Sequence, residues 1–307
     1  MILAFDFGGT KLSAACVPAA DPDHTTWHDH QRLFSPNGAD AQYDLDTMIR
    51  LGHEMMAGKK PAAIGVSFGG PVDFERGFVR LSHHVPGWED CPLQTILEDE
   101  FDVPVSVDND ANVAALGEHR FGAGQGYQDL MYITVSTGIG DGWILNGRPW
   151  RGYEGMAGEI GHTAVDPDGP RCLCGKRGCV ERLASGPYMA ADYSEGSGAK
   201  GEGREMVTGE RVAELAAAGD ALARQILLRG ARALGVGLGN AANLLNPQLF
   251  ILGGGVTNAG EIWWTAVWEA ARKTALPQIH FDIVPAQLGD DAPLWGAVAL
   301  TAVIGNR

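Results

Sequence analysis

The stretch Ile2–Val17, ILAFDFGGTKLSAACV, predicts a buried strand, a glycine turn and a second strand. Its first six residues form a nearly continuous apolar run that only Asp6 interrupts, which is typical of a buried strand. The turn Gly8-Gly9-Thr10-Lys11 leads into a strand and not a helix, which distinguishes it from dinucleotide-binding and P-loop motifs. Paired glycines let an anion approach backbone N–H groups, and Asp6 has the chemistry to position a hydrated magnesium ion. A plain hairpin turn with a solvated Asp6 is the alternative.

The same pattern returns in Leu130–Leu145, LMYITVSTGIGDGWIL. Here the turn between the strands contains Thr137, Gly138 and Gly140. Two strand–turn–strand units of this kind indicate a weak internal repeat. We therefore expect two halves of similar fold, each contributing one anion-binding turn to a shared cleft.

Further glycine and acidic residues follow predicted strands, which is where α/β proteins place ligands. Gly69-Gly70 follows one strand, and Gly253-Gly254-Gly255 follows another and would let a flat ligand lie against the backbone. The run Asp108–Asn112 closes a third strand and opens a helix. One of its residues is expected to cap that helix. Asp110 has two interpretations from position alone, a capping residue or a general base at a strand end.

A compact group of metal-binding residue types lies in Gly158–Glu181, GEIGHTAVDPDGPRCLCGKRGCVE. His162, Cys172, Cys174 and Cys179 supply one imidazole and three thiolates, a set that closes the tetrahedral shell of structural zinc. Free thiols and disulfides are the alternatives. The short Cys-x-Cys spacing disfavours a disulfide, and we expect a reducing compartment, which favours a metal.

Composition sets further limits. The chain has 307 residues, 45% hydrophobic and 20% charged, which are globular values. Its net charge of −15 argues against non-specific binding of nucleic acid or anionic membranes. Met1 leads directly into the first strand without a basic region or a cleavage site, so we expect a cytoplasmic protein without a membrane span. The Gly/Ser-rich stretch Glu195–Gly203 is expected to form a peripheral loop.

Taken together, the motifs resemble the ROK family (repressors, open reading frames and sugar kinases), and its glucokinase-like branch in particular. The residues that carry the resemblance are DFGGTK (6–11), GVSFGGPVD (65–73), DNDANVAALGE (108–118), STGIGDGWILNG (136–147), GMAGEIGH (155–162), CLCGKRGCVE (172–181) and LGGGV (252–256). The resemblance implies an α/β protein with an actin-like ATPase (ribonuclease H-like) fold, in which two α/β domains surround a cleft and one carries a zinc knuckle. We expect a small domain at residues 1–110, joined by the C-terminal helix 292–307, and a large domain at 111–291.

The resemblance also implies an ATP- and magnesium-dependent kinase that phosphorylates a hexose, first of all glucose, and a homodimer. It makes Asp110 the base that accepts the sugar hydroxyl proton. The residues that it implies for sugar binding are Asn109, Glu159, His162, Glu181 and Gly70. The residues that it implies for ATP and its phosphates are Asp6, Gly8, Gly9, Thr10, Lys11, Thr137, Gly138, Gly140, Gly253, Gly254 and Gly255. His162 would bind both zinc and sugar, so the zinc would fix the sugar site.

Two residues depart from the family pattern. Gly69 stands where the family often has Pro, in the loop that approaches the sugar. Asp141 stands beside the second turn where the family usually has Gly. Its charge would oppose ATP unless the side chain points away or helps to hold magnesium.

Several alternatives stay open at this point. Kinases of N-acetylmannosamine, N-acetylglucosamine or allose use the same motifs, because one pocket contact can change sugar selectivity. A non-catalytic sugar sensor is another possibility. A repressor is disfavoured because the first glycine turn begins at residue 8, which leaves no room for a helix-turn-helix, and because the chain is acidic. Polyphosphate as donor is disfavoured by the same acidity.

Overall fold

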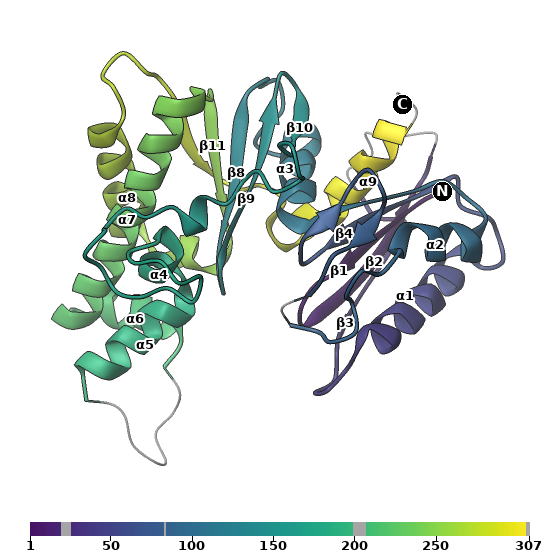
Figure 1. Cartoon of the computed structure of the whole chain (residues 1–307), viewed down its shortest axis with the longest axis horizontal. Coiled ribbons are helices and arrows are strands. Elements are labelled where there is room, and N and C mark those ends of the chain that lie inside the picture. Colours follow the sequence, from purple (N-terminus) through teal and green to yellow (C-terminus); the bar gives the residue numbers. More distant parts are fainter. Residues whose placement is uncertain (20–25, 83, 199–206, 305–307) are drawn as a thin grey trace. The chain divides into compact units, whose positions relative to one another are not determined.

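The computed structural model describes residues 1–19, 26–82, 84–198 and 207–304 (Figure 1). The chain forms two compact units. Unit 1 comprises Met1–Tyr127, Gly142–Ala157 and Gln287–Arg307, and unit 2 comprises Gln128–Asp141 and Gly158–Ala286. We expected the boundary between the two domains after residue 110, and this position lies inside unit 1. Strand β7 runs directly into helix α3 there, and α3 packs against the C-terminal helix α9.

Unit 1 is built on a five-stranded sheet of order β3-β2-β1-β4-β7. Its strands are β1 (Ile2–Phe7), β2 (Lys11–Val17), β3 (Asp29–Phe34), β4 (Ala63–Phe68) and β7 (Val105–Asn109). The first three form an antiparallel meander, and β4 and β7 run parallel to β1. The predicted hairpin is therefore formed, and its glycine turn lies at the same end of the sheet as the C-terminal end of β7.

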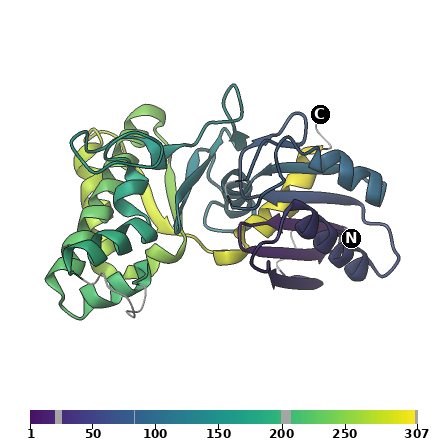
Figure 2. The ribbon, with the colours of Figure 1, turned by 60° about the horizontal axis from the view of Figure 1, so that its bottom comes forward.

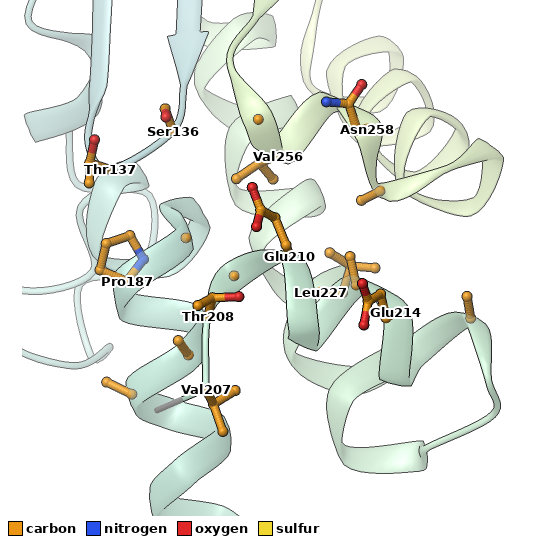
Figure 3. A pocket seen from close by; sticks show the side chains of 18 of the residues that line it. Ser136, Thr137, Pro187, Val207, Thr208, Glu210, Glu214, Leu227, Val256 and Asn258 are labelled. Atoms are coloured by element: carbon orange, nitrogen blue, oxygen red, sulfur yellow. The ribbon is translucent and has the colours of Figure 1, made fainter. Parts of the chain in front are cut away.

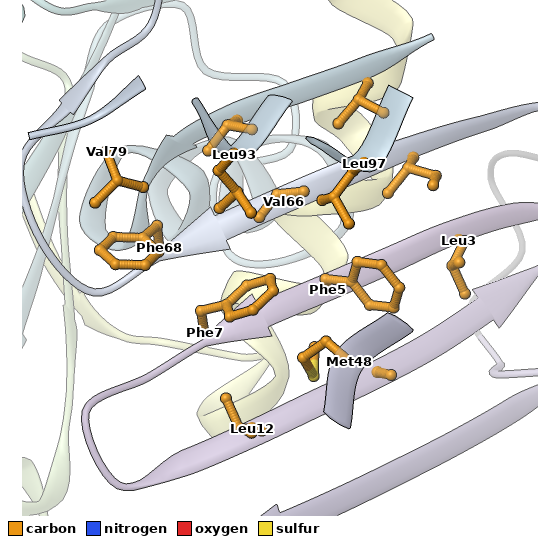
Figure 4. Close-up of a cluster of buried hydrophobic side chains, with 14 of the residues drawn as sticks. Leu3, Phe5, Phe7, Leu12, Met48, Val66, Phe68, Val79, Leu93 and Leu97 are labelled. Atoms are coloured by element: carbon orange, nitrogen blue, oxygen red, sulfur yellow. The ribbon is translucent and has the colours of Figure 1, made fainter. Parts of the chain in front are cut away.

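Helices cover both faces of this sheet (Figure 1). Side chains alternate along β1, so Leu3, Phe5 and Phe7 join a buried cluster with α1 (Ala41–Met56) and α2 (Leu93–Phe101) (Figure 4). α9 (Ala292–Ile304) packs against β1, β4 and α3 (Asp110–Phe121). A small hairpin of β5 (Val72–Asp73) and β6 (Phe78–Val79) follows β4.

A second five-stranded sheet has the order β10-β9-β8-β11-β12. Its strands are β8 (Leu130–Val135), β9 (Ile139–Leu145), β10 (Arg148–Trp150), β11 (Leu249–Gly253) and β12 (Asp282–Pro285). β9 begins in unit 2, and its residues from Gly142 onward belong with β10 to unit 1. If the strands of each sheet are numbered along the chain, both sheets have the order third, second, first, fourth, fifth. This shared order confirms the internal repeat that the two glycine turns predicted.

The helices of unit 2 form a bundle beside its strands (Figure 2). They are α4 (Val180–Ala184), α5 (Gly186–Gly196), α6 (Gly209–Ala217), α7 (Ala221–Leu245) and α8 (Glu261–Thr274), and α7 contacts each of the other four. Short 3-10 helices lie at Ile160–His162 (η1), Gly255–Ala259 (η2) and, in unit 1, Gly289–Asp291 (η3). The expected loop Glu195–Gly203 starts inside α5, and its residues 199–203 lie outside the described residues. Within the described chain, no helix combines the length and apolarity needed to cross a membrane.

Candidate active site and metal centre

Asp110 is the first residue of α3 and follows directly on β7. The capping position belongs to its neighbour, because the Asn109 side-chain oxygen accepts hydrogen bonds from the N–H groups of Ala111 (3.0 Å) and Asn112 (3.4 Å). Asp110 Oδ1 also accepts from Ala111 N–H at 2.8 Å. Since Asn109 caps the helix, the capping interpretation does not account for the carboxylate of Asp110.

The surroundings of Asp110 hold its carboxylate in one orientation. Asn109 Nδ2 donates to Asp110 Oδ1 at 2.9 Å and to the carbonyl oxygen of Gly70 at 3.1 Å. Asp110 Oδ2 faces the glycine turn after β4, at 3.7 Å from where a Cβ on Gly69 would lie. Burial raises the pKa of Asp110 to about 6, although the hydrogen bonds of Ala111 and Asn109 and the charge of His84 lower it. A half-buried carboxylate with this pKa is matched to general-base work near neutral pH.

A buried ion pair supports the strand end that carries Asp110. Asp108 Oδ2 accepts a hydrogen bond from Arg151 Nε at 2.7 Å and lies 2.7 Å from Arg151 Nη2 in the same ion pair, and Asp108 Oδ1 accepts from the N–H of Asn109 at 2.8 Å. The Arg151 guanidinium also lies over the ring of Phe74, 3.6 Å from its centroid. Burial raises the pKa of Asp108, because desolvation outweighs the opposing charge of Arg151. Sequence reasoning missed Arg151, which lies 43 residues from its partner and belongs to no recognisable motif.

The first glycine turn, Gly8–Thr10, also lies in unit 1. Gly8 N–H donates to the carbonyl oxygen of Lys11 (3.0 Å), which closes the turn. Asp6 precedes it and accepts a hydrogen bond from Ser67 Oγ at 2.7 Å. Burial raises the pKa of Asp6 to about 7, and the charge of Asp110 adds to this increase while Ser67 opposes it. Asp6, whose proton affinity is raised by the neighbouring Asp110 carboxylate, supplies with it oxygen donors of the kind that suit a divalent cation.

Two side chains near this turn make contacts that the sequence did not indicate. Lys11, predicted to bind phosphate, forms an ion pair with Asp290 at 3.1 Å. His84, which was not predicted, lies against the turn, because a Cβ on Gly9 would come within 2.9 Å of the His84 Cβ, Cγ and Cδ2. Its charge also acts on Asp110. The only signal in the sequence was its position in the segment between the GGPVD motif and Trp88, which no motif covers.

The second glycine turn, Ser136–Gly138, lies in unit 2. It is closed by a hydrogen bond from Ser136 N–H to the Gly138 carbonyl oxygen at 2.9 Å. Glu181, predicted as a sugar ligand, accepts from Ile139 N–H through Oε2 at 3.0 Å. Its carboxylate is therefore held next to the turn that was predicted to bind phosphate. Gly140 is half-buried in β9, one residue further along the chain.

A cavity of about 940 Å³ lies in unit 2 beside this turn (Figure 3). Ser136 and Thr137 line one part of it, residues between Gly255 and Gly260 another, and α5, α6, Val207, Thr208 and Leu227 of α7 the rest. Of the three predicted glycines, Gly255 lines the cavity and Gly253 ends β11. Gly254 has a φ of +88°, and a Cβ there would lie 2.4 Å from the carbonyl oxygen of Val135, so only glycine fits. The volume suits a ligand of nucleoside size.

Unit 2 also gathers the four predicted metal ligands. The ligand atoms of His162, Cys172, Cys174 and Cys179 all lie within 4.8 Å of one another. The Sγ atoms of Cys174 and Cys179 are 3.5 Å apart, and tetrahedral zinc with thiolates at about 2.3 Å places sulfur atoms about 3.8 Å apart. His162 Nδ1 is buried and has no hydrogen-bond partner among the described residues. Its lone pair fits a metal ligand, so the donor set and its spacing both suit zinc.

Two further residues of unit 2, Asp141 and Glu159, were singled out from the sequence. Glu159 is exposed and directly precedes η1, whose last residue is His162. Asp141 is buried, and its Oδ1 accepts from the N–H of Ile160 at 2.8 Å. The carboxylate is thus directed at the segment that carries Glu159 and His162.

Comparisons with known proteins agree with this geometry. A sequence model of the ROK family matches residues 2–303. The chain belongs to the ROK family. Among curated relatives of this ROK chain, the glucokinase of Halalkalibacterium halodurans is 36% identical over 95% of the chain and 92% of the relative. The N-acetylmannosamine kinase of Shigella flexneri is 33% identical over 97% of both chains.

Solved structures support the same fold. The ROK hexokinase from Thermus thermophilus matches this ROK chain with a TM-score of 0.87 and 34% identity, over 100% of this chain and 99% of that one. The ROK family glucokinase from Streptomyces griseus, in complex with glucose and AMPPNP, matches with a TM-score of 0.80 and 33% identity, over 97% and 98% of the two chains. The fold is therefore the actin-like ATPase fold that the motifs implied.

Proposed function

We propose that this protein transfers the γ-phosphoryl group of ATP to a hexose, with glucose as the first-choice acceptor and glucose 6-phosphate as product. The observation that carries the proposal is Asp110, a half-buried carboxylate with a pKa of about 6, held at the end of β7 by Asn109. Membership of a family that contains glucokinases and hexokinases supports it.

The reaction needs one proton acceptor and a site for the transferred group. The sugar hydroxyl oxygen forms a bond to the γ-phosphorus as the bond from that phosphorus to the β-bridging oxygen breaks. Asp110 accepts the hydroxyl proton, and Oδ2 is suited to this because the described hydrogen bonds to the carboxylate all go to Oδ1. Phosphoryl transfer depends mainly on positioning and charge neutralisation, so a single base is sufficient.

The remaining predicted residues supply that positioning. Gly8–Thr10 in unit 1 and Thr137–Gly140 in unit 2 would bind phosphates through backbone N–H groups other than those of Gly8 and Ile139, which donate to Lys11 and Glu181. Asp6 would hold magnesium, which neutralises phosphate charge when bound. The cavity beside Thr137 and Gly255 would take the adenosine. Its polar residues, among them Glu210 and Asn258, are available to hydroxyl and amino groups of the nucleoside (Figure 3).

Asn109, Gly70, Glu159, His162 and Glu181 are proposed to bind the sugar hydroxyls. Zinc would be held by the three thiolates and His162, and it would fix the imidazole without taking part in the reaction. A zinc ion with four protein ligands has no open position for a substrate.

The identity of the sugar is the most specific part of the proposal. Glucose is favoured by the relatives named glucokinase, and N-acetylmannosamine is the second candidate because a kinase of that sugar matches the chain over the same length. The test is a coupled ADP-release assay with ATP, magnesium and a panel of glucose, N-acetylmannosamine, N-acetylglucosamine, mannose, fructose and allose. The highest kcat/KM is expected for glucose, and a higher value for another sugar would replace it. Absence of turnover on every sugar, with sugar binding still detected by calorimetry, would leave a sensor and overturn the kinase.

We also propose a cytoplasmic homodimer that does not bind nucleic acid. Large apolar side chains are exposed on α7, on α8 and just after α8, with Leu244 at 81%, Trp268 at 52% and Leu276 at 58%. Covering them against a second copy would remove apolar surface from water. Light scattering after size-exclusion chromatography would measure the oligomeric state, and a monomer at micromolar concentration would overturn this part.

A further inference from the structure

Asp141 supplies a hydrogen-bond acceptor that η1 lacks. The first N–H groups of a helix have no partner within it and need one from elsewhere. Glu159 occupies the capping position of η1 and makes no capping hydrogen bond with its side chain. Instead, the buried Asp141 on β9 accepts from Ile160 N–H at 2.8 Å. The start of η1 is thus fixed by a carboxylate from a strand that precedes it by 19 residues.

The backbone of the same segment is packed directly against the start of β9. Gly158 has a φ of +94°, and a Cβ there would lie 2.6 Å from the carbonyl oxygen of Asp141. A Cβ on Gly161 would lie 2.3 Å from the carbonyl oxygen of Ile139. Because neither glycine has a Cβ, the backbone of residues 158–161 packs closely against Asp141 and Ile139. We expect the Asp141 contact to limit any shift of this segment.

This segment carries two groups with predicted roles, Glu159 and His162. A third, Glu181, is held by the N–H of Ile139, two residues before Asp141 on the same strand. The first residues of β9 therefore contact the side chain of Glu181 and the backbone beside Glu159 and His162, the three sugar ligands that unit 2 was predicted to supply. Asp141 makes its contact through its side chain, whereas Ile139 holds Glu181 through its backbone N–H.

We propose that Asp141 is a positioning residue for sugar binding, which acts through the N–H of Ile160 on Glu159 and His162. The proposal rests on the sugar kinase function proposed above. It assigns a role to the acidic residue that departs from the family pattern: the carboxylate orients the sugar ligands and takes no part in binding ATP or magnesium.

The test compares Asp141→Ala with Asp141→Asn. Alanine leaves the buried N–H of Ile160 without its acceptor, whereas the Asn amide oxygen is able to replace Oδ1. We expect Asp141→Ala to weaken glucose binding about tenfold by calorimetry, with the KM for ATP changed less than about twofold. Asp141→Asn is expected to stay within about threefold of the wild type for glucose. Asp168→Ala, which removes an exposed carboxylate from the same region, is the matched control.

The outcomes separate this proposal from the proposed function. Equal glucose affinity in Asp141→Ala and the wild type, or a weakened ATP KM with unchanged glucose binding, would overturn the positioning role. If the wild type binds no sugar at all, the proposed function fails. The rate at which zinc is released to a chelator then tests whether Asp141 positions His162. Faster release from Asp141→Ala than from Asp141→Asn and Asp168→Ala would support it, and equal release would overturn it.

Discussion

Replacing Asp110 with Asn removes one negative charge and keeps the shape of the side chain. The amide oxygen still accepts from Ala111 N–H, as Asp110 Oδ1 does at 2.8 Å. Because an amide does not accept a proton at neutral pH, we expect kcat to fall by a factor of about 10²–10⁴. The same substitution is expected to make the folded protein more stable.

The expected gain in stability follows from the pKa of Asp110. The folded value of about 6 lies above the ordinary value of 3.8, so the ionised carboxylate opposes folding at neutral pH. This cost is fully present above pH 6 and disappears as the pH falls through 6 towards 3.8. At about 1.4 kcal/mol per pKa unit, the difference corresponds to about 3 kcal/mol. The carboxylate is half-buried and partly screened, so we expect about 1–2 kcal/mol.

The assay combines turnover with thermal unfolding at pH 7.5 and pH 5. Asp110→Asn is expected to be nearly inactive with every sugar and more stable than the wild type at pH 7.5, by about 2–6 °C in Tm, with a smaller difference at pH 5. Asp99→Asn is the matched control, since Asp99 is an exposed carboxylate on α2 of the same unit. Retained turnover would show that the base is elsewhere. A loss of stability at pH 7.5 would show that burial does not penalise this carboxylate.

Three further substitutions test other parts of the structure. Cys174→Ser is expected to weaken zinc binding and glucose binding together, measured by chelator titration and calorimetry, and unchanged zinc content would contradict the metal site. His84→Ala removes a charge that lowers the pKa of Asp110, so the acidic limb of kcat/KM is expected to shift to higher pH, and a shift to lower pH would refute the contact. Arg151→Met leaves Asp108 buried without its partner and is expected to cost about 3 kcal/mol of unfolding free energy in denaturant. Adding Asp108→Asn is expected to restore much of this loss, and no recovery would show that the ion pair is not the cause.

The sequence was most informative where function and structure depend on short segments. The hairpins at Ile2–Val17 and Leu130–Leu145 were predictable because apolar runs and glycine turns lie next to one another in the chain. The grouping of His162, Cys172, Cys174 and Cys179 was predictable for the same reason, because these residue types at this spacing favour a shared zinc site. The matching order of the two sheets then confirmed the repeat that these hairpins suggested.

Features that depend on distant residues were not predictable. Nothing near Asp108 indicates that Arg151 will pair with it, and nothing near Asp141 indicates a hydrogen bond from Ile160. Position alone left Asp110 ambiguous, and the hydrogen bonds to the Asn109 side-chain oxygen identify Asn109 as the capping residue. In each case the partner is set by how strands and helices pack, which the local pattern of residues does not encode.

The assembly of unit 1 from three separate stretches of chain has a consequence for its synthesis. α9, the last helix, packs against β1 and β4 near the beginning of the chain. While the ribosome is still translating residues 128–286, the face of that sheet that α9 covers stays exposed, although α1 and α2 are already available to cover the other face. Nascent chains of this protein therefore expose that apolar surface until α9 has been synthesised, and they are expected to depend on chaperones for longer than chains whose domains are completed one after another. A stop codon just before α9 would leave the N-terminal sheet, already made, without the helix that covers this face.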